Sequence, residues 1–76
     1  MPRKNLVRLP LTFKQLQTLS FISESLNENG YPPNLPEIAA NFGIRKTAAW
    51  ERVQTLARKG YIIINKEKHR GIRVLF

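Results

Sequence analysis

Cysteine and aspartate are absent from the 76 residues of this chain, and histidine occurs once. Without cysteine, neither a disulfide nor a thiolate zinc site can support the fold, which fits a reducing compartment. The five acidic residues are scattered glutamates, the serines have no credible histidine partner, and no glycine-rich phosphate loop is present. We therefore expect a protein that is not an enzyme and that uses no metal and no cofactor.

Long apolar runs are also missing. The longest wholly apolar stretch runs from Tyr61 to Ile64, which is far too short to cross a membrane. The basic N-terminus is not followed by the apolar stretch that a signal peptide needs. A hydrophobic share of 42% over 76 residues instead predicts one globular domain with a modest core and no membrane partner.

Positive charge is abundant but unevenly placed. The net charge is +8; residues 1–11, 45–64 and 65–76 carry +3, +4 and +3, whereas residues 12–44 carry −2. An uneven basic surface is typical of a protein that binds a polyanion. Charge alone leaves a second interpretation open, in which the basic residues form a solvated surface with no partner.

A first helix is predicted to begin at Thr12, because Thr12 and Gln15 have the spacing of a capping box. Gly30 suits the left-handed residue that ends a helix, and the prolines after it cannot continue one. The apolar residues expected on the buried stripe of this helix are Leu16, Leu19, Ile22 and Leu26. Residues 1–11 are basic and lack periodicity, so we expect them to form a flexible arm.

Two further helices are predicted with a short turn between them. Asn34 and Glu37 form a second capping box, and Gly43 closes this helix. A third helix is expected from 46 to 59, with Gly60 at its end. The inner stripe of the third helix is predicted to be Ala49, Val53, Leu56 and Ala57. At about 100° per residue, the opposite face carries Thr47, Ala48, Glu51, Thr55 and Arg58.

The C-terminal part has the pattern of a β-hairpin. Residues 61–64 and 72–76 are predicted to pair as two strands around a basic loop at 65–71. Two strands are marginal alone, so they are expected to pack on the helices, and the expected inner residues are Ile62, Ile64, Ile72 and Val74. The predicted fold class is α+β, mainly α: residues 12–76 form a winged helix-turn-helix of three helices followed by a two-stranded β-hairpin wing.

From Leu11 to Leu75 the chain resembles the N-terminal DNA-binding domain of LexA-type SOS repressors. The resemblance rests on Leu11-Thr12, Gln15, Gly30-Tyr31-Pro32-Pro33, Glu37-Ile38-Ala39, Phe42-Gly43, Ala48-Ala49, Leu56-Ala57-Arg58-Lys59-Gly60 and Arg70-Gly71-Ile72-Arg73. It implies a winged helix-turn-helix that binds operator DNA as a dimer, with its recognition helix in the major groove and its wing on the backbone. The residues at the positions of the family's readers are Thr47, Ala48, Trp50 and Glu51.

The sequence departs from the family in two places. Members commonly open the recognition helix with Ser-Pro-Asn, whereas this chain has Lys46-Thr47 and is one residue shorter. The family's C-terminal half, a self-cleaving Ser/Lys peptidase that also dimerises, has no counterpart in these 76 residues. We therefore expect dimerisation to be local, induced by DNA or absent.

The candidate DNA-binding residues lie on the third helix and on the wing. Thr47 is expected to contact a base edge or a thymine methyl group, Ala48 to allow close approach, and Glu51 to accept a hydrogen bond from a cytosine amino group. Basic side chains are expected to neutralise phosphates or, in the case of arginine, to bind guanine. They are Arg45, Lys46 and Arg52 on the helix and Lys66, Lys68, His69 and Arg70 on the wing.

Three aromatic residues leave alternatives open. Trp50 stands at a reader position by the resemblance, but its helical angle places it at the core margin, where tryptophan more often packs. It also suits an anchor for a protein partner. Phe21 falls off the expected stripe of the first helix and, together with Phe13, marks a candidate protein contact.

The sequence favours a sequence-specific transcription regulator that binds double-stranded DNA, and the resemblance makes it a repressor. The helix 46–59 is expected in the major groove and the wing 65–71 on the backbone. The expected partners are DNA and a second copy of the chain, and the expected location is the cytoplasm of a prokaryote, in a nucleoid-associated or phage- or plasmid-encoded protein. The alternative is an accessory regulator that binds a protein, such as a host repressor or RNA polymerase.

Overall fold

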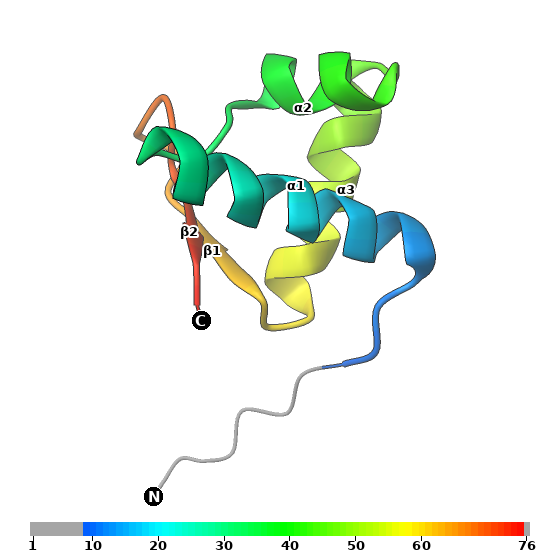
Figure 1. The fold of residues 1–76 in the computed structure, drawn as a ribbon. Helices are drawn as coiled ribbons and strands as arrows, with labels where there is room; N and C mark the ends of the chain where they lie inside the picture. The colour runs from blue at the N-terminus through cyan, green and yellow to red at the C-terminus, as the bar shows by residue number, and fades with distance from the viewer. Residues whose placement is uncertain (1–8, 76) are drawn as a thin grey trace, which may run out of the picture.

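The structure is a computed structural model that describes residues 9–75, so the arm residues Arg3, Lys4 and Arg8 lie outside the described residues. Three helices, α1 (Phe13–Asn29), α2 (Leu35–Phe42) and α3 (Lys46–Arg58), precede two strands, β1 (Ile62–Ile64) and β2 (Ile72–Val74). Figure 1 shows α1 crossing α3, with α2 at one end of α3 and the hairpin beside the helices. The predicted fold, three helices followed by a two-stranded wing, is confirmed.

Each of the first two helices begins at a capping box, as the sequence predicts. Thr12 Oγ1 accepts a hydrogen bond from the Gln15 amide at 3.3 Å, and Gln15 Oε1 accepts one from the Thr12 amide at 2.9 Å. Asn34 and Glu37 make the same reciprocal pair at the start of α2, at 2.9 and 3.0 Å. The third helix differs, because its N-cap residue Arg45 makes no capping hydrogen bond with its side chain. The first-turn amides of α3 therefore lack a capping side chain.

The turn between α2 and α3 depends on Gly43. Its φ of 64° is a left-handed conformation that residues with a β-carbon adopt only at a cost. This conformation lets the Ile44 amide donate to the Ala39 carbonyl at 3.0 Å and so closes the end of α2. Because α2 ends at Phe42 and α3 begins at Lys46, the connection between the two helices of the motif is short.

One hydrophobic core joins the helices to the hairpin. Its buried apolar residues are Ile22, Ile38, Ala39, Ala49, Val53, Leu56 and Ile62. The other three expected inner residues of the hairpin pack against this cluster, and they are Ile64, Ile72 and Val74. Within residues 9–75, no helix has the length and apolar character needed to span a membrane.

The buried stripe of α1 differs from the predicted one. Leu16 was expected inside but is 50% exposed, whereas Thr18, Ile22 and Ser25 are buried. Thr18 enters the core at little cost because its hydroxyl donates a hydrogen bond to the Lys14 carbonyl at 2.9 Å. The prediction for Leu16 was wrong because it assigned burial by hydrophobicity alone. It did not consider that Thr18 can be buried when its hydroxyl is hydrogen-bonded within the helix.

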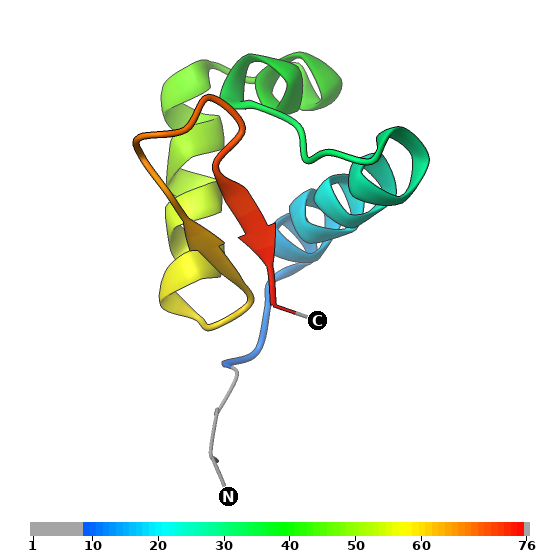
Figure 2. The same ribbon diagram turned by 90° about the vertical axis from the view of Figure 1, so that its left-hand side faces the viewer.

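The hairpin is antiparallel, and its opposed residues are Ile62 and Val74, Ile63 and Arg73, and Ile64 and Ile72. Its strands are shorter than predicted. The Tyr61 amide bonds to the Leu56 carbonyl at 3.0 Å, so Tyr61 belongs to the turn that closes α3 rather than to β1. Figure 2 shows the hairpin lying beside α3, with its loop reaching the start of α2.

Residues 9–11, which the sequence assigns to the arm, contact the end of α3. The Leu9 amide donates to the Lys59 carbonyl at 3.3 Å, and the Tyr61 hydroxyl donates to the Leu9 carbonyl at 2.8 Å. Lys59 Nζ donates to the Pro10 carbonyl at 2.9 Å and to Gln15 Oε1 at 2.7 Å. These contacts hold the segment against the domain just before the N-cap of α1.

Candidate nucleic-acid interface

The outward face of α3 brings several candidate residues together. Thr47 and Glu51 are exposed, and Ala48 beside them is half-buried. Arg45 and Lys46 stand at the N-terminal end of the same helix, and both are exposed. In the described part of the chain, neither cation makes a side-chain hydrogen bond or ion pair. The uncapped end of α3 thus presents two unpaired cations next to a polar face.

Arg52, the third candidate cation of α3, is engaged within the domain. Its guanidinium lies 5.2 Å from the centre of the Phe42 ring, and its Nη1 donates to Thr18 Oγ1 at 3.4 Å. The side chain is half-buried by these contacts. Arg52 therefore joins α3 to α1 and α2, apart from the exposed cations at the start of α3.

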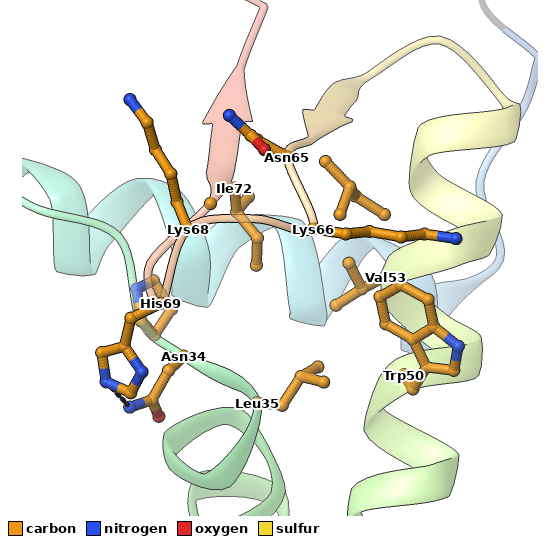
Figure 3. Close-up of a pocket in the computed structure, with 12 residues that line it drawn as sticks. Asn34, Leu35, Trp50, Val53, Asn65, Lys66, Lys68, His69 and Ile72 are labelled. Carbon is orange, nitrogen blue, oxygen red and sulfur yellow. Dashed lines mark hydrogen bonds between the residues drawn. The ribbon is translucent and has the colours of Figure 1, made fainter.

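A cavity of about 260 Å³ separates α3 and the start of α2 from the wing (Figure 3). Its apolar walls are Pro33, Leu35, Trp50, Val53, Ile64 and Ile72. Lys66 Nζ lies over the Trp50 ring, 5.7 Å from its centre, from the wing side. Trp50 is half-buried and packs between the core margin and the wing. Its indole therefore does not extend freely into solvent from the outward face of α3.

The wing loop carries two exposed lysines, followed by two candidates, His69 and Arg70, that contact the start of α2. Lys66 and Lys68 are exposed, and both line the edge of the cavity. His69 is exposed, but its Nε2 lies 3.2 Å from Nδ2 of Asn34. Because Oδ1 of Asn34 already accepts the Glu37 amide, the amide nitrogen faces His69, and Nε2 then acts as the acceptor.

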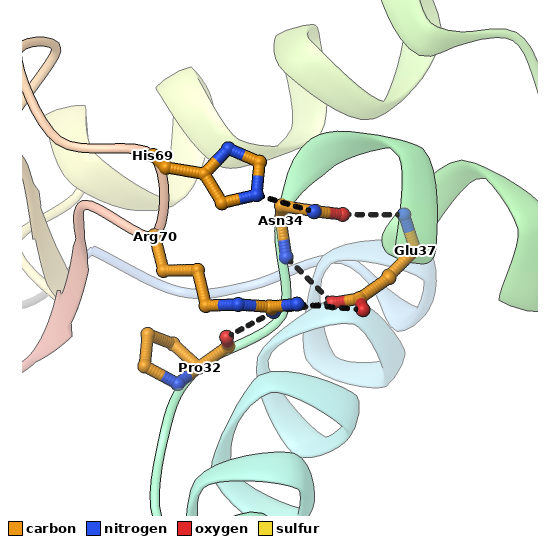
Figure 4. Close-up of polar contacts among 5 residues, drawn as sticks. All are labelled: Pro32, Asn34, Glu37, His69 and Arg70. Carbon is orange, nitrogen blue, oxygen red and sulfur yellow. Dashed lines mark hydrogen bonds and ion pairs between the residues drawn. The ribbon is translucent and has the colours of Figure 1, made fainter.

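Arg70 turns toward α2 and forms a two-point pair with Glu37 (Figure 4). Its Nη1 donates to Oε1 at 2.6 Å and its Nη2 donates to Oε2 at 2.9 Å. The hydrogen bonds from Arg70, followed by the amide of Asn34, lower the pKa of Glu37 to about 2. The same pairing raises the pKa of Arg70. The positive charge of Arg70 is therefore neutralised within the domain by the Glu37 carboxylate.

Sequence reasoning missed the residues of α2 and its preceding loop that receive the wing. Glu37 and Asn34 were identified only as a capping box, which is a local pattern, whereas their wing partners lie more than thirty positions later in the chain. Tyr31 was noted only within the segment Gly30-Tyr31-Pro32-Pro33 that carries the family resemblance, yet the centre of its ring lies 4.5 Å from the Arg70 guanidinium carbon. One feature of the sequence could have indicated this contact. Arg70 precedes Gly71 in the predicted loop, and an arginine there can reach an acidic residue on a neighbouring element.

The two phenylalanines proposed as a protein contact are placed differently from each other. Phe21 was expected off the packing surface, but it packs edge-to-face on Phe42, with 5.7 Å between the ring centres. That expectation was wrong because the end of α2 extends the packing surface of α1 beyond one stripe. Phe13 is 73% exposed and borders a shallow hollow whose walls include Phe21 and Phe42.

Comparison with known proteins identifies the family of this chain. The sequence profile described as the LexA DNA binding domain matches residues 8–71. A LexA repressor of Pseudomonas chlororaphis is 45% identical over 67 residues, which cover 87% of this chain and 33% of the relative. A LexA repressor of Leptospira biflexa serovar Patoc is 38% identical over 65 residues, with coverages of 86% and 32%. The chain thus spans about a third of the length of these curated relatives. The resemblance seen in the sequence is confirmed, and the chain belongs to the LexA DNA-binding domain family.

Proposed function

We propose that this domain binds double-stranded DNA with sequence preference and represses transcription, with α3 in the major groove and the wing on the backbone. The observation that carries the proposal is the outward face of α3, where Arg45 and Lys46 are exposed and unpaired next to Thr47 and Glu51. A helix fits the major groove, and lysines and arginines that neutralise phosphates supply the sequence-independent affinity. Membership of a family of DNA-binding domains, with LexA repressors as relatives, supports the same function.

Within α3, we assign the base contacts to Thr47, Ala48 and Glu51. Thr47 presents a hydroxyl and a methyl group to a base edge, and Ala48 allows the helix to approach closely. The Glu51 carboxylate accepts a hydrogen bond from a cytosine amino group and repels a misplaced phosphate, so it acts against wrong registers. Arg45 and Lys46, at the start of the helix, make phosphate contacts that carry no sequence information.

On the wing, we assign the phosphate contacts to Lys66 and Lys68. Both side chains are exposed, and the Lys66 contact with Trp50 places the wing next to α3. Trp50 itself is proposed to support this edge of the interface rather than to read a base. The candidates that are engaged within the domain, and that we expect to contribute through position more than through direct phosphate contact, are Arg52, His69 and Arg70.

We further propose that two copies bind adjacent half-sites. A single module covers little DNA surface, and such readers commonly use a second half-site to reach useful affinity. Phe13 is the proposed contact residue between the two copies, because its ring is exposed on α1. Among the charged side chains of this helix, Lys14 is outnumbered by Glu24 and Glu28. Two chains of net charge +8 repel each other less at this helix, which carries one positive and two negative side chains, than at α3 or the wing. Sedimentation with and without DNA tests this, since Phe13→Ser should reduce the dimer fraction.

The cytoplasm of a prokaryote is the proposed location, on the basis of the family. Alanine substitutions compared on one preferred site and one scrambled site test the proposed function. Arg45→Ala and Lys46→Ala should weaken binding to both DNAs equally. Thr47→Ala and Glu51→Ala should change the preference, by about 1–3 kcal/mol per base position.

Lys14→Ala is the matched control for that comparison, because it removes one exposed positive charge from α1. It should leave both affinities nearly unchanged. If Lys14→Ala weakens binding as much as Arg45→Ala does, net charge rather than the face of α3 governs binding, and the proposal is wrong.

A further inference from the structure

The wing loop is joined to the start of α2 through a single arginine that makes contacts in three directions. Besides its two hydrogen bonds to Glu37, Arg70 donates from Nη1 to the Pro32 carbonyl at 2.9 Å (Figure 4). The guanidinium carbon also lies 4.5 Å from the centre of the Tyr31 ring. A planar fork held by a carboxylate, a carbonyl and an aromatic face has little freedom to turn toward another partner.

The neighbouring residue adds a second tie between the same two segments. His69 contacts the side chain of Asn34, the N-cap residue of α2, and Glu37 accepts the Asn34 amide at 3.0 Å. The partners of the wing are thus the two members of the capping box that begins α2: Asn34 donates to His69, and Glu37 accepts from Arg70. Any shift of the wing relative to α2 must break contacts with both of them.

The loop that carries these two residues is itself closed by backbone contacts. The Asn65 amide donates to the Gly71 carbonyl at 2.8 Å, and the Lys68 amide donates to the Asn65 carbonyl at 3.2 Å. A β-carbon at position 71 would overlap the Asn65 carbonyl, so only glycine permits this closure. Because the loop is tight, fixing Arg70 also fixes the direction in which Lys66 and Lys68 leave the wing.

The ion pair between Arg70 and Glu37 matters for the position of the wing more than for the stability of the fold. The side chains of Arg70 and Glu37 are 28% and 46% exposed, and an ion pair with that exposure adds little to the free energy of unfolding. A negative charge is also unfavourable on a protein surface that approaches phosphates. Glu37 has two contacts that offset this cost, namely the capping box of α2 and the pair with Arg70.

We propose that Glu37 and Arg70 are positioning residues that clamp the wing to the N-terminus of α2. The clamp sets the wing at the angle at which Lys66 and Lys68 reach the DNA backbone while α3 lies in the groove. Arg70 then acts through Glu37 instead of through a phosphate. This inference rests on the proposed DNA binding and assigns to Glu37 a part in it.

Two variants with different effects on charge test the clamp. Glu37→Gln makes the domain one unit more positive, and Arg70→Lys keeps the charge but removes the two-point fork. We expect each to weaken binding about tenfold and to lower the slope of log affinity against log salt by about one to two, as the loss of wing phosphate contacts requires. Glu28→Gln makes the same charge change at the opposite end of α1 from the proposed contact residue Phe13, and it should bind at least as well as the parent chain.

The outcomes separate this inference from the proposed function. If Glu37→Gln binds as tightly as the parent or more tightly, with an unchanged salt slope, the clamp is wrong and Glu37 acts only in the capping box of α2. If Glu37→Gln loses helix content through its capping box, Arg70→Lys decides alone, because it leaves the Asn34–Glu37 box intact. Failure of the parent chain to bind any DNA counts against the proposed function instead.

Discussion

Lys66 of the wing and Trp50 of α3 are in contact, with 5.7 Å between the ammonium nitrogen and the centre of the indole ring. The wing and α3 therefore meet along one edge, which is lined beneath by apolar residues. Trp50 is the only tryptophan in the sequence, so its emission reports on this edge alone. The contact also distinguishes Lys66 from Lys68, because Lys68 makes no such contact with an aromatic ring within residues 9–75.

Lys66→Ala is expected to weaken binding to all DNA sequences by a similar factor. The lysine is assigned to a phosphate, so its loss should reduce the salt slope by about one without altering preference. The lost ring contact should lower the free energy of unfolding by about 1 kcal/mol or less. Anisotropy titrations at several salt concentrations measure the slope, and a changed base preference would contradict the assignment.

Substitutions on α1 test which stripe is buried. Ile22 is fully buried, so Ile22→Ala should reduce the free energy of unfolding by about 2–5 kcal/mol. Leu16 is 50% exposed, so Leu16→Ala should cost about 0.5 kcal/mol. Urea unfolding followed by circular dichroism measures both values. Equal costs for the two substitutions would restore the stripe first expected from the sequence.

Acid should remove the small stabilisation that Glu37 contributes to the fold, and it should do so in a defined pH range. Its pKa is lowered from 4.5 to about 2 by Arg70 and Asn34, so the folded state binds this proton less readily than the unfolded state. The stability due to this carboxylate is therefore present above pH 4.5 and is lost as the pH falls toward 2. Thermal melts should show the difference between the parent chain and Glu37→Gln shrinking over that range. A difference that stays constant would mean that the ion pair does not form.

Gly43→Ala should destabilise the domain through backbone conformation alone. The φ of Gly43 is 64°, and a β-carbon at this position would meet no atom within 4 Å. The expected cost is therefore the left-handed penalty of about 1–2 kcal/mol. Gly43→Asn is the matched control, since asparagine tolerates this conformation better and should cost less. If both variants are equally unstable, the turn depends on something other than φ.

Local patterns in the sequence predicted the elements well, because capping boxes and terminal glycines act over three or four residues. Asn34 and Glu37 were identified correctly as the start of α2. The same residues show the limit of such patterns, because their contacts with the wing depend on tertiary folding. Burial on α1 was misjudged for a related reason. Thr18 becomes an acceptable core residue only through its bond to the Lys14 carbonyl, which hydrophobicity does not report.

Selection from a pool of random double-stranded DNA at moderate salt tests whether this domain prefers one DNA sequence. We expect one enriched motif, bound about a thousandfold or more tightly than scrambled DNA, and arranged as an inverted repeat if two copies bind. Thr47→Ala should shift the enriched motif at one position, whereas Arg45→Ala should enrich the same motif more weakly. Recovery of no preferred sequence, with affinity that depends on salt alone, would contradict the claim that this domain reads DNA.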